Sequence, residues 1–311
     1  IPLQQSVADL GIAYKNFFDS LKGKRKGKKV GTPKFKKKLG KQSARFRIGG
    51  FSIKGDSVYL AKIGNISPVW SRELPSSPSS VTVVKDAANR YFLSFVVEIE
   101  PVQVEAKNHS IGIDLGIKTF AAMSNGEMLN SPNYSQLDKR LRRKQRQLAR
   151  QSKGSKRREK TRLQIAKLHN EIADTRKDFL HKLSTRVVNE NQVITLEDLN
   201  VSGMVKNRRL ARAISMQGWR EFRVLCEAKS EKLVRKFVVS SRWEPTSQIC
   251  SDCGYKWGKL DLSIRSVLCI SCGSEHDRDE NAAKNINKVG IGHCHDSKRT
   301  RIDRQTTLVA S

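Results

Sequence analysis

Two closely spaced pairs of cysteines constrain the fold of this chain more than any other feature. Each pair has the pattern C-x2-C followed directly by glycine, and fifteen residues separate the two pairs. The cysteines are Cys250, Cys253, Cys269 and Cys272. Two such turns supply the four thiolates that tetrahedral zinc requires, and the glycines permit the tight backbone bends. The spacing predicts a zinc ribbon over residues 242–275, with a structural ion because protein fills all four coordination positions.

The alternative for these cysteines is a pair of disulfide bonds, which are typical of exported chains. The sequence shows no signal peptide and no apolar run of about 18 residues. We therefore expect a protein of the cytoplasm or nucleoid, with no membrane partner and with metal at the cysteines. Of the other two cysteines, Cys226 is expected to be a small buried hydrophobic residue. Cys294, between His293 and His295, lies in a tail over 291–311 that we expect to be flexible, and no second ligand pair is nearby.

The charge of the chain is strongly positive, with 60 Lys+Arg against 30 Asp+Glu and a net charge of +30 over 311 residues. A compact fold with this charge repels itself unless an anion neutralises it, and nucleic acid is the expected polyanion. Two segments, 22–47 and 139–162, hold thirteen basic residues each. Solvated surface segments are the alternative for both. The residues that we expect to contact nucleic acid are Lys36, Lys37, Lys38, Arg140, Arg142, Arg143, Arg146, Arg150, Arg157 and Arg158.

Apolar periodicity divides the chain into helices and strands. Residues 2–21 have the pattern of an amphipathic helix, and residues 134–190 have that of a basic helical hairpin that reverses near Gly154. Apolar strands at 110–124 and 193–196 open the main domain. Short alternating segments predict a barrel-like antiparallel unit near the N-terminus. These segments are 46–53, 57–63, 81–85 and 91–99. Together the elements predict a multidomain chain of the α+β or α/β class.

Three acidic residues stand where an apolar pattern ends or a helix begins. Asp114 and Glu197 each follow an apolar strand, and Asp279 begins a predicted helix. Carboxylates on separate elements can converge to hold two Mg²⁺ ions, which prefer oxygen ligands and share substrate phosphates. Each acid alone also has a simpler explanation. Asp114 fits a turn, Glu197 or Asp198 fits a helix cap, and Asp279 fits an N-cap.

Four motifs occur in an order that is typical of one family. They are Gly112-Ile113-Asp114-Leu115-Gly116, Leu196-Glu197-Asp198-Leu199, Thr246-Ser247-Gln248-Ile249-Cys250-Ser251-Asp252-Cys253-Gly254 and Asp279-Glu280-Asn281-Ala282-Ala283-Lys284-Asn285-Ile286. With these motifs the chain resembles the OrfB/TnpB proteins of IS200/IS605 elements, which are relatives of the Cas12 nucleases. The resemblance covers nearly the whole chain. It implies an RNase H-like (RuvC) core in which Asp114, Glu197 and Asp279 are the catalytic, Mg²⁺-binding acids.

The resemblance also implies an order of domains. A basic N-terminal helix and barrel-like nucleic-acid-binding region spans 1–105. The nuclease core comprises 106–241 and 276–290, and the zinc ribbon 242–275 is inserted into it. Family members usually begin with a strand before the first helix. Because this chain starts at that helix, we expect an N-terminally truncated copy with intact catalytic residues.

The function that the resemblance implies is RNA-guided DNA cleavage. A guide RNA from the transposon end supplies sequence by base pairing with the DNA substrate, and two Mg²⁺ ions serve hydrolysis of the phosphodiester. Two alternatives remain: a non-catalytic nucleic-acid-binding regulator of transposition, and a strand-transfer transposase with the same metal chemistry. The sequence leaves the guide RNA, the flanking DNA motif and the oligomeric state open.

Overall fold

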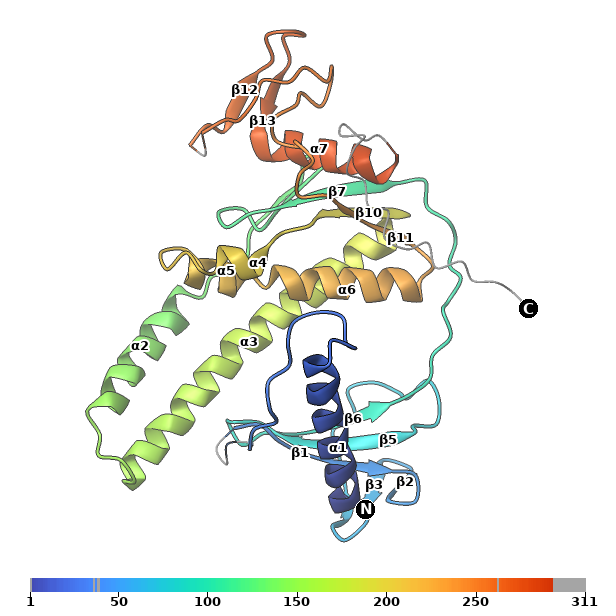
Figure 1. The fold of residues 1–311 in the computed structure, drawn as a ribbon, viewed down its shortest axis with the longest axis vertical. Helices are drawn as coiled ribbons and strands as arrows, with labels where there is room; N and C mark the ends of the chain where they lie inside the picture. Colours follow the sequence, from blue (N-terminus) through green and yellow to red (C-terminus); the bar gives the residue numbers. More distant parts are fainter. Residues whose placement is uncertain (1, 36, 38–39, 262, 293–311) are drawn as a thin grey trace. The chain divides into compact units, whose positions relative to one another are not determined.

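The computed structural model of the chain describes residues 2–35, 37, 40–261 and 263–292 (Figure 1). It divides into two compact units. The first comprises Ile1–Glu100 and Leu137–Glu171, and the second comprises Pro101–Gln136 and Ile172–Ser311. Within the described ranges, no helix combines the length and the apolar character needed to span a membrane. The histidines and the cysteine at 293–295 lie outside the described residues, as does the rest of the expected tail from residue 293 on.

The first unit contains helix α1, two small antiparallel sheets and the Leu137–Glu171 part of a helical hairpin. Helix α1 spans Pro2–Leu21, and its Asp9 accepts an ion-paired hydrogen bond of 2.6 Å from Arg45. One sheet has the order β1-β5-β6, and the other has the order β2-β3-β4. Their bounds are β1 Gln42–Arg47, β2 Phe51–Lys54, β3 Ser57–Leu60, β4 Gly64–Ile66, β5 Ser80–Lys85 and β6 Tyr91–Val96. Buried side chains from both sheets form a shared apolar core, namely Phe46, Val58, Leu60 and Val81.

Two of the predicted strands are interrupted where glycine or a left-handed residue lets the backbone turn, and the expected strand 91–99 ends at Val96. The expected strand 46–53 is split, since Gly49 has a φ of 81° and Gly50 N–H donates to Arg47 O at 2.8 Å. The two halves therefore join different sheets. The expected strand 57–63 ends at Leu60, before Lys62 with a φ of 70°. Antiparallel pairing of these segments is confirmed.

The predicted helical hairpin is present as α2, Ser135–Ala149, and α3, Lys156–Glu190. Gly154 adopts a φ of 85° in the connecting turn, a conformation that glycine reaches without a steric penalty. Ser155 then starts α3, because its hydroxyl accepts a hydrogen bond of 3.2 Å from Arg158 N–H. The reversal near Gly154 is thereby confirmed.

The second unit is built on a five-stranded sheet of order β11-β10-β7-β8-β9. Strand β10 runs parallel to both β7 and β11, whereas β8 and β9 continue in antiparallel fashion. The bounds are β7 Ser110–Leu115, β8 Ala121–Met123, β9 Met128–Leu129, β10 Val193–Glu197 and β11 Lys236–Ser240. The remaining elements of this unit are α4 Val201–Met204, α5 Ala211–Gln217, α6 Trp219–Lys232, β12 Ser266–Leu268, β13 Glu275–Asp277 and α7 Arg278–Gly290.

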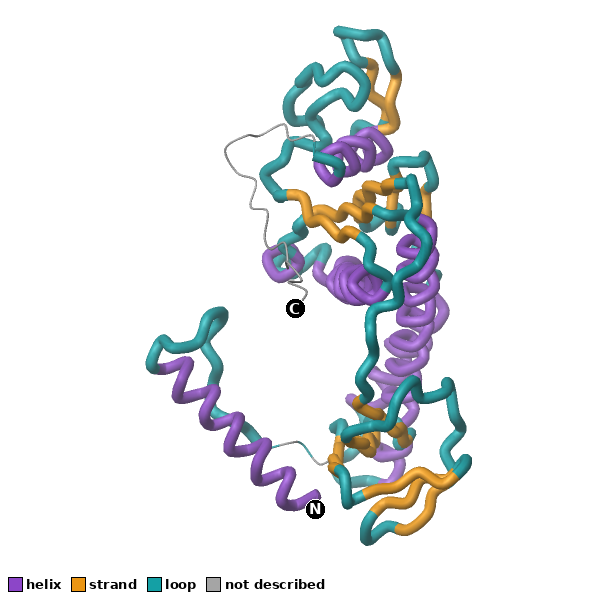
Figure 2. Tube along the Cα trace, turned by 90° about the vertical axis from the view of Figure 1, so that its right-hand side faces the viewer, coloured by secondary structure: helices purple, strands orange, loops and turns teal. Residues whose placement is uncertain are grey.

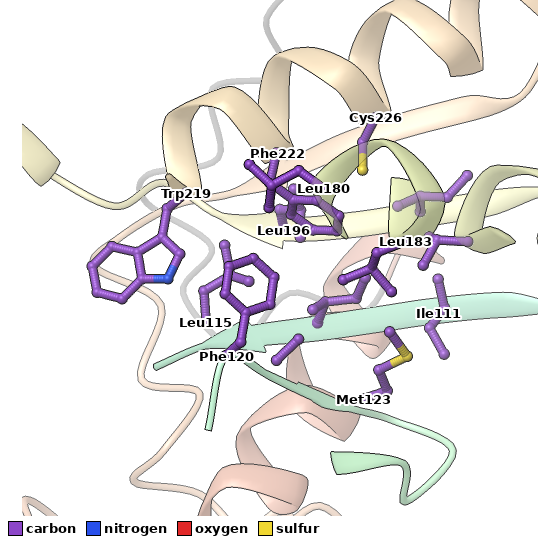
Figure 3. Packing of buried hydrophobic residues seen from close by; sticks show 14 of the residues in the cluster. Ile111, Leu115, Phe120, Met123, Leu180, Leu183, Leu196, Trp219, Phe222 and Cys226 are labelled. Carbon is purple, nitrogen blue, oxygen red and sulfur yellow. The ribbon is translucent and has the colours of Figure 1, made fainter. Parts of the chain in front are cut away.

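Helices cover both faces of this sheet (Figures 1 and 2). Helix α6 and the second half of α3 lie on one face, and α7 lies on the other. The apolar core fills the first face, where Leu180, Leu196 and Phe222 are fully buried (Figure 3). Cys226 of α6 is part of this core, as expected from the sequence. The mixed α/β class is confirmed by this arrangement.

Helix α7 packs directly on the backbone of the sheet, and two glycines make this approach possible. A Cβ atom on Gly112 of β7 would lie 2.2 Å from Ala283 O of α7. A Cβ atom on Gly290 of α7 would lie 1.8 Å from Thr195 Oγ1 of β10. Both distances are far inside van der Waals contact, so no larger residue fits at either position. These contacts fix the helix over β7 and β10.

Candidate active site and metal centre

The parallel register of β7 and β10 brings two of the predicted acids to one edge of the sheet. Leu196 pairs with Ile113, so Glu197 and Asp114 each take the next position of their strands. Side chains alternate between faces along a strand. Asp114 therefore shares the face of Gly112, and Glu197 shares that of Thr195, which is the face that α7 covers.

Asp279 reaches the same edge from α7. It is the second residue of that helix and is partly buried, as are Asp114 and Glu197. Asn287 of α7 contacts Ser110 of β7 and Ala283 lies against Gly112, so the preceding turn of the helix brings Asp279 to the level of Asp114. Burial and then the negative charges of Glu197 and Asp279 raise the pKa of Asp114 to about 7, and Arg278 opposes the rise. The structure thus brings together the three acids that the sequence selected, which we call the acid cluster.

Glu197 is also disfavoured as an anion at this edge. Burial is the main reason that its pKa is raised, the charge of Asp198 adds to the rise, and Arg242 opposes it. Like charges gathered in a partly buried site repel one another unless a cation binds them. Carboxylate oxygens are the ligands that Mg²⁺ prefers. The donor set therefore fits hard divalent cations.

The simpler explanations for these acids do not hold. Asp114 lies within β7 rather than in a turn. The N-cap of α4 is Asn200, whose side chain accepts from Gly203 N–H at 3.1 Å, and not Glu197 or Asp198. The N-cap of α7 is Asp277, which accepts from the N–H groups of Asp279 and Glu280. Neither capping nor turn formation therefore accounts for the carboxylates of the acid cluster.

Contacts of three arginines at this edge were not found from the sequence. Arg265, just before β12, donates to both carboxylate oxygens of Asp279. Asp198 forms ion pairs with Arg223 at 2.9 Å and with Arg242. Among the described residues, only the four cysteines bring three or more ligand atoms within 4.8 Å of one another. The carboxylates of the acid cluster therefore lie farther apart than the sulfur atoms of the cysteine cluster.

The four cysteines form a compact cluster in which every pair of sulfur atoms lies within 4.8 Å. Cys250 Sγ lies 3.7 Å from Cys272 Sγ, and Cys253 Sγ lies 3.6 Å from Cys269 Sγ. Tetrahedral zinc with Zn–S bonds of about 2.3 Å requires sulfur atoms roughly 3.8 Å apart. Disulfide bonds of about 2.05 Å are ruled out by these distances. The cluster therefore fits zinc, and the disulfide alternative is wrong.

Each cysteine pair sits in a turn that its glycine makes possible. Gly254 N–H donates to Cys250 O at 3.0 Å, and Gly273 N–H donates to Cys269 O at 2.8 Å. Both glycines have positive φ values, of 78° and 76°. The antiparallel pair β12-β13 supports the second turn. These two turns and the short sheet provide the local frame of the cluster.

A buried histidine contacts the cysteine cluster, and no pattern in the sequence marked it. His276 of β13 places Nε2 at 3.1 Å from Cys250 Sγ and at 3.8 Å from Asp252 Oδ2. Burial raises the pKa of the Cys250 thiol to about 12. A buried thiol of this kind becomes a thiolate when a metal binds it. His276 is placed to donate a hydrogen bond to that sulfur.

The predicted nucleic-acid contacts differ in their surroundings. Lys36 and Lys38 lie outside the described residues, and Lys37 is exposed. Most of the selected arginines are exposed on α2, directly after it or at the start of α3, namely Arg140, Arg142, Arg143, Arg146, Arg150 and Arg157. Arg142 also forms an ion pair of 2.8 Å with Asp138. Arg158 is partly buried and donates to Leu148 O and to Gln151 O at the end of α2. Its guanidinium holds the turn of the hairpin together.

Comparisons with known proteins identify two family models that match parts of the chain. Residues 94–208, which include Asp114 and Glu197, match a family model described as "Probable transposase" of the OrfB_IS605 family. Residues 219–286, which include Asp279 and the cysteine cluster, match the "Cas12f1-like, TNB domain". Each matched segment thus contains part of the acid cluster.

Whole-chain relatives cover almost all of the sequence. The chain is 39% identical to a "Putative RNA-guided DNA endonuclease" of Streptomyces pristinaespiralis, over 99% of this chain and 76% of the relative. It is 31% identical to "Putative RNA-guided DNA endonuclease InsQ" of Escherichia coli K12, over 94% and 74%. A solved structure titled "Cryo-EM structure of the Cas12f1-sgRNA-target DNA complex" shares the fold, with a TM-score of 0.55, 15% identity and coverage of 88% of this chain and 69% of that chain. The chain therefore belongs to the OrfB/TnpB family of IS605-type proteins.

Proposed function

We propose that this protein is an RNA-guided DNA endonuclease that hydrolyses phosphodiester bonds with two Mg²⁺ ions. The observation that carries the proposal is the meeting of Asp114, Glu197 and Asp279 at one edge of the sheet. There the charges of neighbouring acids and arginines act on each of the three carboxylates. The names of the relatives support the same activity. A structural zinc ion in the cysteine cluster completes the set of cofactors.

We propose further that the five-stranded sheet and its helices form an RNase H-like core of the RuvC type. The core would comprise 106–241 and 276–290, with the zinc ribbon 242–275 inserted. Two features support this: the acids lie at the ends of neighbouring parallel strands, and the fold is shared with the Cas12f1 chain. Residues 1–105 would form the nucleic-acid-binding region, for which the structure offers two small antiparallel sheets.

The chain's own residues would act mainly by holding charge in place. Asp114, Glu197 and Asp279 would bind the ions, which activate water and stabilise the leaving oxygen when bound. Asp114 must lose its proton before it binds a cation, and its raised pKa makes this step sensitive to pH near neutrality. Arg223 and Arg242 form ion pairs with Asp198. This fourth carboxylate would therefore be neutralised by arginines rather than by metal.

The partners of this activity would be a guide RNA from the transposon end and a DNA target. The net charge of +30 supports a large polyanionic partner. The exposed arginines of α2 supply a basic helix surface, because Arg143 and Arg146 recur at the three-residue spacing of one helical face, and Arg150 follows directly after the helix ends. The same surface would suit the phosphate backbone of either nucleic acid.

The test is cleavage of matched target DNA by protein that was co-expressed with the RNA of its own element. We expect Mg²⁺-dependent cutting by the unmodified chain and none by Asp114→Ala or Glu197→Ala. Asp178→Ala, which removes an exposed acid of α3 outside the acid cluster, serves as the matched control. Salt-sensitive binding without any cutting would instead support a binding regulator, and joined transposon–target products would support a strand-transfer transposase.

A further inference from the structure

The helix that carries Asp279 also carries two buried asparagines one turn apart. Asn281 and Asn285 of α7 are 1% and 0% exposed. Residues four positions apart lie on the same side of a helix. A buried carboxamide is costly unless its hydrogen bonds are made, so the partners of these two side chains show what they hold.

The hydrogen-bond partners of the two asparagine side chains are backbone groups of the first cysteine turn and of the residues leading to it. Asn281 Oδ1 accepts from Ser251 N–H at 2.7 Å, and its Nδ2 donates to Ile249 O at 2.8 Å. Asn285 Nδ2 donates to Thr246 O at 2.8 Å and to Ile249 O at 2.7 Å. Ile249 and Ser251 are the two chain neighbours of Cys250. The asparagines therefore hold the backbone on both sides of that thiol.

The opposite side of α7 is fixed to the sheet. Gly112 meets Ala283, and Gly290 meets Thr195, at distances that leave no space for a side chain. Asn287 Nδ2 donates to Ser110 Oγ of β7 at 3.0 Å. Helix α7 is thus held on one side by the sheet that carries Asp114 and Glu197, and on the other by the cysteine turn.

A second set of contacts joins the ribbon to the start of α7. Arg278 N–H donates to Arg265 O at 2.8 Å, and Arg278 Nη1 donates to Asp261 O at 2.8 Å. Arg265 itself contacts Asp279. Asp279 therefore lies between these contacts and Asn281, which follows two positions later in the helix.

We propose that Asn281 and Asn285 are positioning residues that couple zinc in the cysteine cluster to divalent-metal binding at Asp279. A cysteine turn without metal loses its fixed geometry, because thiolate–zinc bonds are what fold so small a segment. Ser251 N–H and Ile249 O then leave the asparagines, whose buried amides lose their partners. The first turn of α7 shifts, and Asp279 moves relative to Asp114. This coupling rests on the proposed function, and by linkage it acts in both directions.

The coupling can be measured on the full chain without any nucleic acid. Mn²⁺ binding is followed by electron paramagnetic resonance, and zinc release to a chromogenic chelator is followed in parallel. We expect Asn281→Ala and Asn285→Ala to weaken Mn²⁺ binding about tenfold or more, as is usual for residues that orient metal ligands, and to speed zinc release. Asn287→Ala, which loses a contact to the sheet rather than to the ribbon, should release zinc at the rate of the unmodified chain.

Removal of zinc from the unmodified chain should reproduce the loss of Mn²⁺ binding, and zinc addition should restore it. Asn281→Asp keeps the acceptor for Ser251 N–H but loses the donor to Ile249 O, so it should fall between the unmodified chain and Asn281→Ala. Variants that fold, retain zinc and bind Mn²⁺ as tightly as the unmodified chain would overturn the proposal. So would full Mn²⁺ binding by the zinc-stripped chain.

Hydrogen exchange separates failure of the coupling from failure of the proposed function. If the zinc-loaded chain binds no Mn²⁺ and Asp114→Ala changes nothing, the proposed function fails. The coupling is then tested by amide hydrogen exchange alone. Zinc removal and Asn281→Ala should both speed exchange in 249–254 and in the first turn of α7. If exchange rates in α7 do not change with zinc in any variant, that result alone would overturn the coupling.

Discussion

Arg265 Nη1 lies 3.0 Å from one carboxylate oxygen of Asp279 and 3.2 Å from the other. The guanidinium of Arg265, in the zinc ribbon, thus forms an ion pair with the carboxylate that we propose as a metal ligand. Both side chains are partly exposed, at 46% for Arg265 and 29% for Asp279. The pair is therefore weak enough to exchange one cation for another.

Replacement of Arg265 by alanine should tighten divalent-metal binding. The incoming ion no longer displaces a partner from Asp279, and an exposed pair of this kind contributes up to about 1 kcal/mol, or roughly fivefold in affinity. Titration of Mn²⁺ into Arg265→Ala and Arg265→Lys measures the effect, with the lysine variant expected between alanine and the unmodified chain. Weaker binding in Arg265→Ala would show that the arginine assists the metal site rather than competing with it.

Asp114 should make stability depend on pH in metal-free buffer. Its pKa is raised from 3.8 to about 7 by burial, then by Glu197 and Asp279, while Arg278 opposes the rise. The folded state therefore holds a proton that the unfolded state has lost, so the contribution of Asp114 is fully present below pH 3.8 and is lost as the pH rises through about 7. Asp114→Asn has no carboxyl proton to lose. Its free energy of unfolding should therefore exceed that of the unmodified chain by a growing amount over the same pH range, up to about 4 kcal/mol.

Urea unfolding of both proteins at several pH values measures this difference. Mn²⁺ affinity of the unmodified chain should rise across the same range, because only the ionised carboxylate binds a cation. A difference between the two proteins that stays constant with pH would contradict the proton on Asp114.

Asp198 should act through its two arginines. Burial alone would raise its pKa, but hydrogen bonds from Arg242 and Arg223 outweigh burial and lower the pKa. Asp198→Ala leaves both guanidinium groups without this carboxylate, and it should cost about 1 kcal/mol of stability because the pairs are partly exposed. Thermal unfolding measures the loss. Arg220→Ala, an exposed change on the same helix as Arg223, should leave the midpoint unchanged.

Gly112→Ala should displace α7 from the sheet. The new methyl group would meet Ala283 O at 2.2 Å, which the backbone must relieve by moving. We expect a loss of about 2–3 kcal/mol together with weaker Mn²⁺ binding. Urea unfolding and Mn²⁺ titration measure the two effects. Gly11→Ala, in α1 with nothing within 4 Å of the added atom, is the control and should be neutral or slightly stabilising.

Arg143 and Arg158 should separate nucleic-acid binding from hairpin structure. Arg143 is exposed on α2, so Arg143→Ala should weaken nucleic-acid binding and reduce the salt slope by about one. Arg158 donates to Gln151 O, so Arg158→Ala should lower the helical content of the hairpin. Salt titrations of RNA affinity and circular dichroism distinguish the two outcomes. Equal effects of both changes on the salt slope would contradict this division.

The sequence predicted those elements whose pattern is local. Strands rich in isoleucine and leucine end in Asp114 and Glu197, and parallel strands bring such ends to the same edge. Each cysteine turn contains its own glycine, so its geometry also follows from the local sequence. The meeting of the acids and the cysteine cluster could be expected for these reasons. The catalytic and nucleic-acid-binding roles remain predictions.

The features that the sequence did not predict depend on contacts between distant residues. Nothing near Arg265 marks it as the partner of Asp279, because the contact arises only when the ribbon folds back on α7. His276 reaches Cys250 across the ribbon in the same way. The split of the strand 46–53 was missed because its alternating side chains outweighed the turn at Gly49. Apolar periodicity reports burial, and it says little about which polar groups meet.

The contact of α7 with bare backbone at Gly112 has a consequence for motion. Most helices pack on side chains that can change rotamer as the helix slides, but no side chain separates α7 from β7 at Gly112. From Ala283 to Gly290, the helix and strands β7 and β10 should therefore move as one rigid piece, and the first turn of α7, which carries Asp279, is not part of it. Access for a substrate must then come from parts that surround this piece, and not from tilting of the helix itself.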